Sequence, residues 1–107
     1  MTPTQIAETY FVSAQIAVSD VQAAKADGYD VIICNRPDDE EAGQVNHEAI
    51  KAACEAEDIV FHFMPMQGPN FTPEYVEQVK ALIADNKKVL GYCRTGNRSS
   101  ILFNAAQ

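Results

Sequence analysis

The sequence predicts an α/β domain with a mainly parallel sheet flanked by helices. Short apolar runs at 30–35, 59–64 and 88–92 are typical of strands buried on both faces. The segments between them carry apolar residues at helical spacing and begin with residues that cap helices. Alternating strands and helices favour right-handed crossovers, so we expect these three strands to lie parallel in one sheet, with helices on both faces.

The first part of the chain predicts two strands joined by a helix. The segment 10–16 is rich in β-forming residues and predicts a short strand. Ser19 then fits the N-cap of a helix that ends at Gly28, because glycine adopts the left-handed conformation that terminates helices. The strand at 30–35 is followed by a polar loop at 36–44, which has no regular apolar spacing.

The remaining elements are expected to be a helix at 46–57, a strand at 59–65, a helix from Thr72, a strand at 87–92 and a helix at 99–107. Asn46 and Thr72 are good N-cap residues, and Pro73 suits the first position of a helix. Because the carboxyl ends of parallel strands meet at one edge, that edge should collect Arg36, the 65–71 loop and the residues after Tyr92.

Length and charge restrict the classes of function. The 107 residues suit one domain, 1–107, with one core. A net charge of -7 argues against nucleic acid or an anionic membrane as a general partner, since both require basic surfaces. No apolar run is long enough to span a membrane, and the N-terminus lacks the pattern of a signal peptide. The last helix ends with the chain, so a longer natural protein or an absent leader stays open.

The three cysteines predict free thiols in a reducing, cytoplasmic environment. Their number is odd and they lack metal-ligand spacing, so we expect no disulfide framework, no metal and no cofactor. Cys34 lies in an apolar strand and Cys54 on the inner face of a helix, which favours core positions for both. Cys93 differs, because it begins the polar segment of "YCRTGNRSS".

The segment after Cys93 predicts an oxyanion site. A turn between a strand and a helix directs several backbone N–H groups at one point, and the helix dipole adds to their attraction. Gly96 allows a positive φ or a close ligand, while Arg94 and Arg98 can add forked donors. The same field should lower the pKa of the Cys93 thiol. The other side chains expected at the oxyanion are those of Thr95, Asn97 and Arg36.

Arg36 has two interpretations that the sequence does not separate. It stands at a strand end beside the acidic segment "RPDDEE", so it could pair with that segment or help to bind the anion.

The pattern Cys-x-x-Gly followed by Arg and Ser resembles the active loop of cysteine-dependent phosphatases, and also that of rhodanese sulfurtransferases. Over most of the chain, "FVSAQI", "NRPDDEE", "MPM" and "YCRTGNRSS" resemble the phosphatase-like domain family of bacterial beta-lactamase hydrolase-like proteins. This resemblance implies a cysteine-dependent, phosphatase-like fold similar to that of dual-specificity phosphatases. It also implies Cys93 as nucleophile, Arg98 as phosphate ligand and Ser99 as the group that assists release of the thiolate.

Two departures from the phosphatase pattern bear on the chemistry. Ser99 holds the position of the essential phosphatase arginine, and Arg98 comes one position early, as in the shorter rhodanese loop. The loop that carries the phosphatase general acid has no carboxylic residue here. General-acid catalysis is typically worth about 10²–10⁴-fold, so another acid is needed for efficient hydrolysis. Asp38 and Asp39, with Glu40 and Glu41 after them, are the candidates.

Three hypotheses follow for the activity. The first is a phosphatase-like hydrolase acting on phosphomonoesters of a small anionic substrate or a phosphoprotein. The second is a sulfurtransferase that carries a persulfide on Cys93, for which the short loop is suited and no general acid is needed. The third is a binder of anions or phosphopeptides without catalysis, which leaves the cysteine unexplained.

Overall fold

The computed structural model describes all 107 residues. Its elements are β1 (Thr4–Gln5), β2 (Tyr10–Ser13), α1 (Asp20–Ala26), β3 (Val31–Cys34), α2 (His47–Ala56), β4 (Val60–Phe63), α3 (Pro73–Ala84), β5 (Val89–Tyr92) and α4 (Asn97–Ala105). The five strands form one sheet in the order β1-β2-β5-β3-β4. β2, β5, β3 and β4 run parallel, and only β1 is antiparallel to its neighbour, which confirms the predicted fold class.

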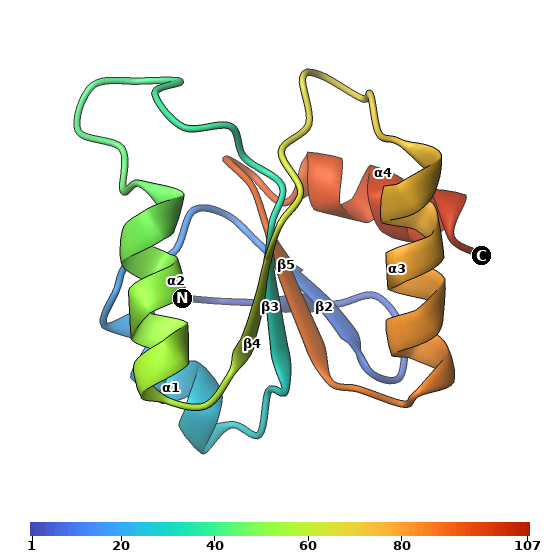
Figure 1. Cartoon of the computed structure of the whole chain (residues 1–107), viewed down its shortest axis with the longest axis horizontal. Helices are drawn as coiled ribbons and strands as arrows, with labels where there is room; N and C mark the ends of the chain where they lie inside the picture. The colour runs from blue at the N-terminus through green and yellow to red at the C-terminus, as the bar shows by residue number, and fades with distance from the viewer.

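Helices cover both faces of the sheet, with α1 and α2 on one side and α3 and α4 on the other (Figure 1). The alternation of side chains along each strand creates a core on each side. In β3, Val31 and Ile33 join the core under α3 and α4, whereas Ile32 and Cys34 join the core under α1 and α2. None of the helices is both long and apolar enough to cross a membrane.

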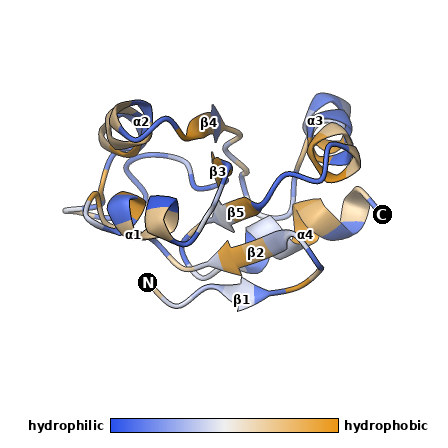
Figure 2. Ribbon diagram, turned by 90° about the horizontal axis from the view of Figure 1, so that it is seen from below, coloured by the Kyte–Doolittle hydropathy of each residue, from blue (hydrophilic) through white to orange (hydrophobic).

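β4 differs from the prediction of a strand buried on both faces. It lies at the edge of the sheet (Figure 2) and pairs only with β3, so its apolar side chains are partly in solvent. Val60 is 53% exposed and Phe63 is 37% exposed. An apolar run alone does not distinguish an edge strand from a central one, because the strand order depends on contacts between distant segments.

The ends of several elements also differ from the sequence expectations. The strand predicted at 10–16 stops at Ser13, and the short strand β1, which pairs with it, was not predicted. Ser19 has a helical backbone and makes no capping hydrogen bond. Asp20 caps this turn instead, because its carboxylate accepts a hydrogen bond from the N–H of Ala17 at 2.7 Å.

The helices next to the carboxyl edge start as predicted, with one exception. Asn46 and Thr72 each accept a hydrogen bond from a backbone N–H in the first turn of their helices, α2 and α3. α4 begins at Asn97 instead of the predicted Ser99, with Gly96 as its N-cap residue. The earlier start brings the N-terminus of α4 directly against Cys93, where its unpaired N–H groups can act on the thiol.

Candidate active site

The segment after β5, residues 93–98, is called the cysteine turn, and it is held in place by the turn after β2. The N–H of Cys93 donates to the carbonyl of Ser13 at 3.3 Å, and the N–H of Gln15 donates to the carbonyl of Arg94 at 3.4 Å. Gly96 has a φ of 95°, and a Cβ there would lie 3.5 Å from the backbone of Ser13. The left-handed conformation and this close approach together explain the glycine.

The sulfur of Cys93 lies inside a ring of backbone N–H groups. Cys93 is only 1% exposed, and the N–H of Gly96 donates to its Sγ at 3.0 Å. Burial by itself raises the pKa of this thiol, but hydrogen bonds from the backbone N–H groups of Ser99, Thr95, Arg98 and Gly96 outweigh it, so the pKa is lowered. The arrangement favours a thiolate, as the sequence predicted.

Ser99 is fixed by a buried residue, Asn35, that was not among the predicted site residues. Both Ser99 and Asn35 are completely buried, and the hydroxyl of Ser99 donates to the Oδ1 of Asn35 at 2.9 Å. The Nδ2 of Asn35 donates in turn to the carbonyl of Met64 at 2.9 Å. A polar residue at the end of the apolar run 30–35 was the available signal, because a buried amide needs partners.

The other side chains expected at the oxyanion form the rim of the turn. Thr95 and Asn97 are exposed, and the Oγ1 of Thr95 accepts a hydrogen bond from the N–H of Asn97 at 3.3 Å. Arg94 is also exposed and makes no ion pair. All three lie near Cys93 in the chain and line cavities beside the turn.

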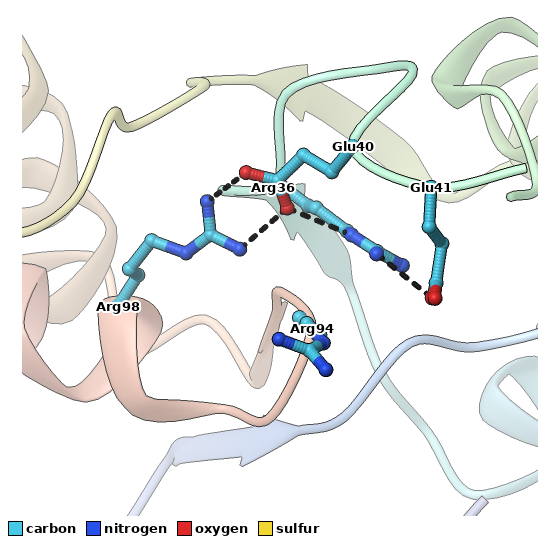
Figure 3. A pocket seen from close by; sticks show the side chains of 5 residues that line it. All are labelled: Arg36, Glu40, Glu41, Arg94 and Arg98. Atoms are coloured by element: carbon cyan, nitrogen blue, oxygen red, sulfur yellow. Dashed lines mark hydrogen bonds and ion pairs between the residues drawn. The ribbon is translucent and has the colours of Figure 1, made fainter.

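Arg98 forms a two-pronged ion pair with Glu40, an acidic residue from the loop after β3 (Figure 3). Its two Nη atoms each donate to one oxygen of Glu40 at 2.7 Å, and its Nη1 also donates to the carbonyl of Met66 at 3.0 Å. The hydrogen bonds from Arg98, and further those from Arg36, lower the pKa of Glu40 to about 2 despite its partial burial. Glu40 is therefore an anion at neutral pH.

Arg36 is paired with the acidic loop, which was one of the two interpretations from the sequence. Only 2% of it is exposed. Its Nε donates to Glu40 at 2.9 Å, its Nη2 to Glu41 at 3.0 Å and its Nη1 to the side-chain oxygen of Gln15 at 3.1 Å. In this arrangement Arg36 holds the carboxylate that in turn holds Arg98.

The two predicted acids lie apart from the cysteine turn. Asp38 bonds to His47, with one oxygen accepting from the backbone N–H at 2.9 Å and the other contacting the ring Nδ1. The ring of His47 stacks on Phe63 of β4. Asp39 is exposed at a bend where φ is 62°. Among the acidic residues of this loop, Glu40 is the one that contacts the cysteine turn.

A cavity of about 420 Å³ brings all three arginines of the chain together (Figure 3). Its lining consists entirely of charged side chains, from Arg36, Glu40, Glu41, Arg94 and Arg98. A neighbouring cavity shares Arg94 and Arg98 and reaches Gly68 in the loop after β4. The prediction that Arg36, the 65–71 loop and the cysteine turn meet at one edge is confirmed. No group of three or more His, Cys, Asp or Glu side chains is placed to hold a metal ion.

Comparisons with known proteins identify the family of the chain. The family model described as "Beta-lactamase hydrolase-like protein, phosphatase-like domain" matches residues 4–107. A beta-lactamase hydrolase-like protein of Agrobacterium fabrum is 29% identical over 104 residues, which are 96% of this chain and 24% of that protein. The chain therefore spans about a quarter of that relative.

Solved structures give the same picture of the fold. A structure from Neisseria meningitidis, described as that of a candidate phosphatase, is 35% identical, with a TM-score of 0.78 over 92% of this chain and 71% of the other. The catalytic core of the PP-IP phosphatase of S. cerevisiae is 16% identical and superimposes with a TM-score of 0.65 over 94% of this chain and 61% of its own. At that identity the likeness concerns the fold alone.

Proposed function

Since this chain belongs to the phosphatase-like domain family of beta-lactamase hydrolase-like proteins, we propose that it is a cysteine-dependent phosphatase acting on small, highly charged phosphomonoesters. The observation that carries this proposal is the ring of backbone N–H groups around the buried sulfur of Cys93, which lowers the pKa of the thiol. The same N–H groups suit the equatorial oxygens of a phosphoryl group, and Arg98 adds a cation.

The chemistry needs two displacements at phosphorus. The Cys93 thiolate attacks the phosphorus, the bond from phosphorus to the ester oxygen breaks, and the leaving group departs as an oxyanion that takes a proton from solvent. Water then attacks the phosphocysteine, the phosphorus–sulfur bond breaks, and inorganic phosphate and the thiolate are released. The buried Ser99 is fixed by Asn35 and contributes its backbone N–H to the returning thiolate.

The lining of the cavity favours a small, hydrophilic substrate over a phosphotyrosine peptide. A phenyl ring gains binding energy by burying its apolar surface, and the cavity that holds the three arginines is lined only by charged side chains. Arg94 is free of carboxylate partners, so it can bind a second anionic group on the same molecule. In a chain of net charge -7, this is the place where such a molecule is attracted.

A second candidate function is sulfur transfer, and the lack of a proton donor favours it. Glu40 is ionised and Asp38 is engaged by His47, so neither is ready to protonate an alkoxide. In this reaction the Cys93 thiolate attacks the outer sulfur of thiosulfate, the sulfur–sulfur bond breaks, and sulfite leaves without needing a proton. A thiol or cyanide acceptor then takes the sulfur from the Cys93 persulfide.

One side-by-side assay separates the two functions. We expect turnover of an aryl phosphate, with much slower turnover of an alkyl phosphate, because a phenolate can leave unprotonated whereas an alkoxide cannot. Cys93→Ser should abolish both. Failure to hydrolyse either ester, together with a mass increase of one sulfur atom on Cys93 after incubation with thiosulfate, would overturn the phosphatase in favour of the sulfurtransferase.

A further inference from the structure

The hydrogen bonds of Arg98 can be counted donor by donor. An arginine guanidinium has five N–H donors in one plane. The two Nη atoms give one hydrogen each to Glu40, and Nη1 gives its second to the carbonyl of Met66. The Nε–H and the second hydrogen of Nη2 have no acceptor among these contacts. In a planar guanidinium these two point in the same direction, as a fork on one side of the group.

We infer that Glu40 is a positioning residue. Its carboxylate binds both Nη atoms of Arg98 and so orients the guanidinium with its Nε–H and the second N–H of Nη2 toward a bound oxyanion. This inference rests on the proposed assignment of the cysteine turn as an oxyanion site. Two oxygens of a phosphoryl or sulfur oxyanion match such a fork, with both hydrogen bonds charge-assisted. Arg98 also directs its backbone N–H at the sulfur of Cys93, so its side chain starts beside the same site.

The ion pair between Glu40 and Arg98 is itself held by the buried Arg36. Arg36 follows β3 and is 98% buried, and its Nε donates to the same Glu40 oxygen that accepts from the Nη2 of Arg98. Gln15 and Glu41 fix the remaining edges of Arg36, so this guanidinium has little freedom to move. The chain of contacts from Arg36 through Glu40 to Arg98 appears in Figure 3. It joins the loop after β3 to the N-terminus of α4 across the cavity.

A competing model gives Glu40 the opposite effect. A carboxylate bonded to the arginine of an anion site could act as a built-in competitor that substrate must displace. Loss of its negative charge would then tighten oxyanion binding. Positioning predicts weaker binding in spite of the more positive cavity, because a freed Arg98 must lose side-chain freedom each time it binds.

The test measures binding of tungstate, a tetrahedral dianion, by calorimetry with the full chain carrying Cys93→Ser. Adding Glu40→Gln should weaken tungstate binding by roughly tenfold, the factor expected for one poorly aligned charge-assisted contact. Glu41→Gln is the matched control, because the substitution removes the same charge while Glu41 contacts Arg36 and not Arg98. It should change the affinity much less than Glu40→Gln does, because the contacts between Glu40 and Arg98 remain. Glu40→Asp keeps the charge, and a partial loss there supports positioning if Glu40→Gln folds poorly.

A double-mutant cycle shows whether Glu40 acts through Arg98. In the presence of Arg98→Ala, we expect Glu40→Gln to have no further effect on tungstate affinity. Additive effects, or tighter binding by Glu40→Gln than by Glu41→Gln, would overturn the inference while leaving the cysteine turn as an oxyanion site. Absence of tungstate binding even with Glu40 and Arg98 intact would overturn the oxyanion site itself, and the inference with it.

Discussion

Cys34 ends β3 and Cys93 directly follows β5. Both are buried, and their pKa values are shifted in opposite directions. The strands are neighbours, and Cys34 pairs in register with Tyr92, the residue before Cys93. Cys34 is 2% exposed and Cys93 is 1% exposed, so the two are buried to the same degree. Burial raises the pKa of Cys34 to about 11, whereas the pKa of Cys93 is lowered below its ordinary value.

The difference lies in the backbone groups that face each sulfur. The Cys34 thiol donates to the carbonyl of Arg36 at 3.3 Å, and the hydrogen bonds that lower its pKa, from Tyr92 and the backbone of Arg36, do not offset the effect of burial. After Cys93 the chain turns at Gly96 into α4, so N–H groups point at the sulfur. Burial thus has no fixed effect on reactivity, because the polarity of the surrounding backbone decides which form of the thiol is favoured.

Replacing each cysteine in turn should give the largest contrast. We expect Cys93→Ser to reduce turnover of an aryl phosphate by several orders of magnitude, since an alkoxide nucleophile is much harder to form than a thiolate. Cys34→Ser should retain turnover and lower the free energy of unfolding by about 1–2 kcal/mol, as expected for a changed side chain in the core. Comparable loss of turnover in both variants would show that the two strand ends do not differ in function.

Alkylation by iodoacetamide tests the thiolate directly. The lowered pKa of Cys93 means that its thiolate fraction rises with pH earlier than that of an ordinary thiol with a pKa of 9.0. We expect modification of Cys93 with a rate midpoint below that value, and protection of Cys34 in the native protein. Peptide mass mapping across pH assigns each site. A midpoint for Cys93 at or above 9.0 would remove the distinction between the two cysteines.

The arginines of the cysteine turn allow a finer test of the β5 side. Arg98→Lys should weaken sulfate or vanadate binding by roughly 1–3 kcal/mol, because lysine keeps the charge but loses the fork. Arg94→Lys should cost less, since Arg94 stands at the exposed rim without an ion pair. Titrations of the two variants against the wild-type chain provide the measurement. Equal losses would mean that geometry at Arg98 has no special part in binding.

Much of the fold and of this site is predictable from short stretches of sequence. The turn "CRTGNRSS" combines a strand end, a glycine and a helix start, and these local signals are sufficient to place amides around Cys93. The buried runs at 30–35 and 88–92 likewise predict the central strands β3 and β5. Local spacing is informative there because the residues that act together are close in the chain.

The contacts between distant segments could not be predicted from the sequence. Nothing local distinguishes Glu40 from Asp38 in "RPDDEE", yet one meets Arg98, far along the chain, and the other meets His47. The position of β4 at the sheet edge and the bond from Ser99 to Asn35 also depend on how the chain closes in three dimensions. Such choices among similar polar residues follow from tertiary structure.

Lowering the pH should weaken the ion pairs that Glu40 forms with Arg98 and Arg36, and with them the stability of the fold. The pKa of Glu40 falls from an ordinary 4.5 to about 2 because Arg98, and then Arg36, bond to its charged form. A lowered carboxyl pKa gives stability that is complete above about pH 5 and is lost as the pH falls through 4.5 toward 2. We expect this stability to amount to about 1 kcal/mol, well under the full value of the shift, because the pair is partly exposed to solvent.

Urea unfolding at a series of pH values tests this directly, with the wild-type chain and Glu40→Gln compared at each pH. The wild-type chain should be more stable near neutral pH, and the difference in unfolding free energy should shrink as the pH falls toward 2, because protonation removes the charge that the amide lacks throughout. Glu41→Gln removes the same charge from a mostly exposed position and controls for the net charge of the chain. A difference between wild type and Glu40→Gln that stays constant from neutral pH to pH 2.5 would mean that the Glu40 carboxylate gains nothing from Arg98 and Arg36. The loop after β3 and the N-terminus of α4 would then be held together by other contacts, such as the hydrogen bond from Ser99 to Asn35, and the ion pair between Glu40 and Arg98 would lose its energetic basis.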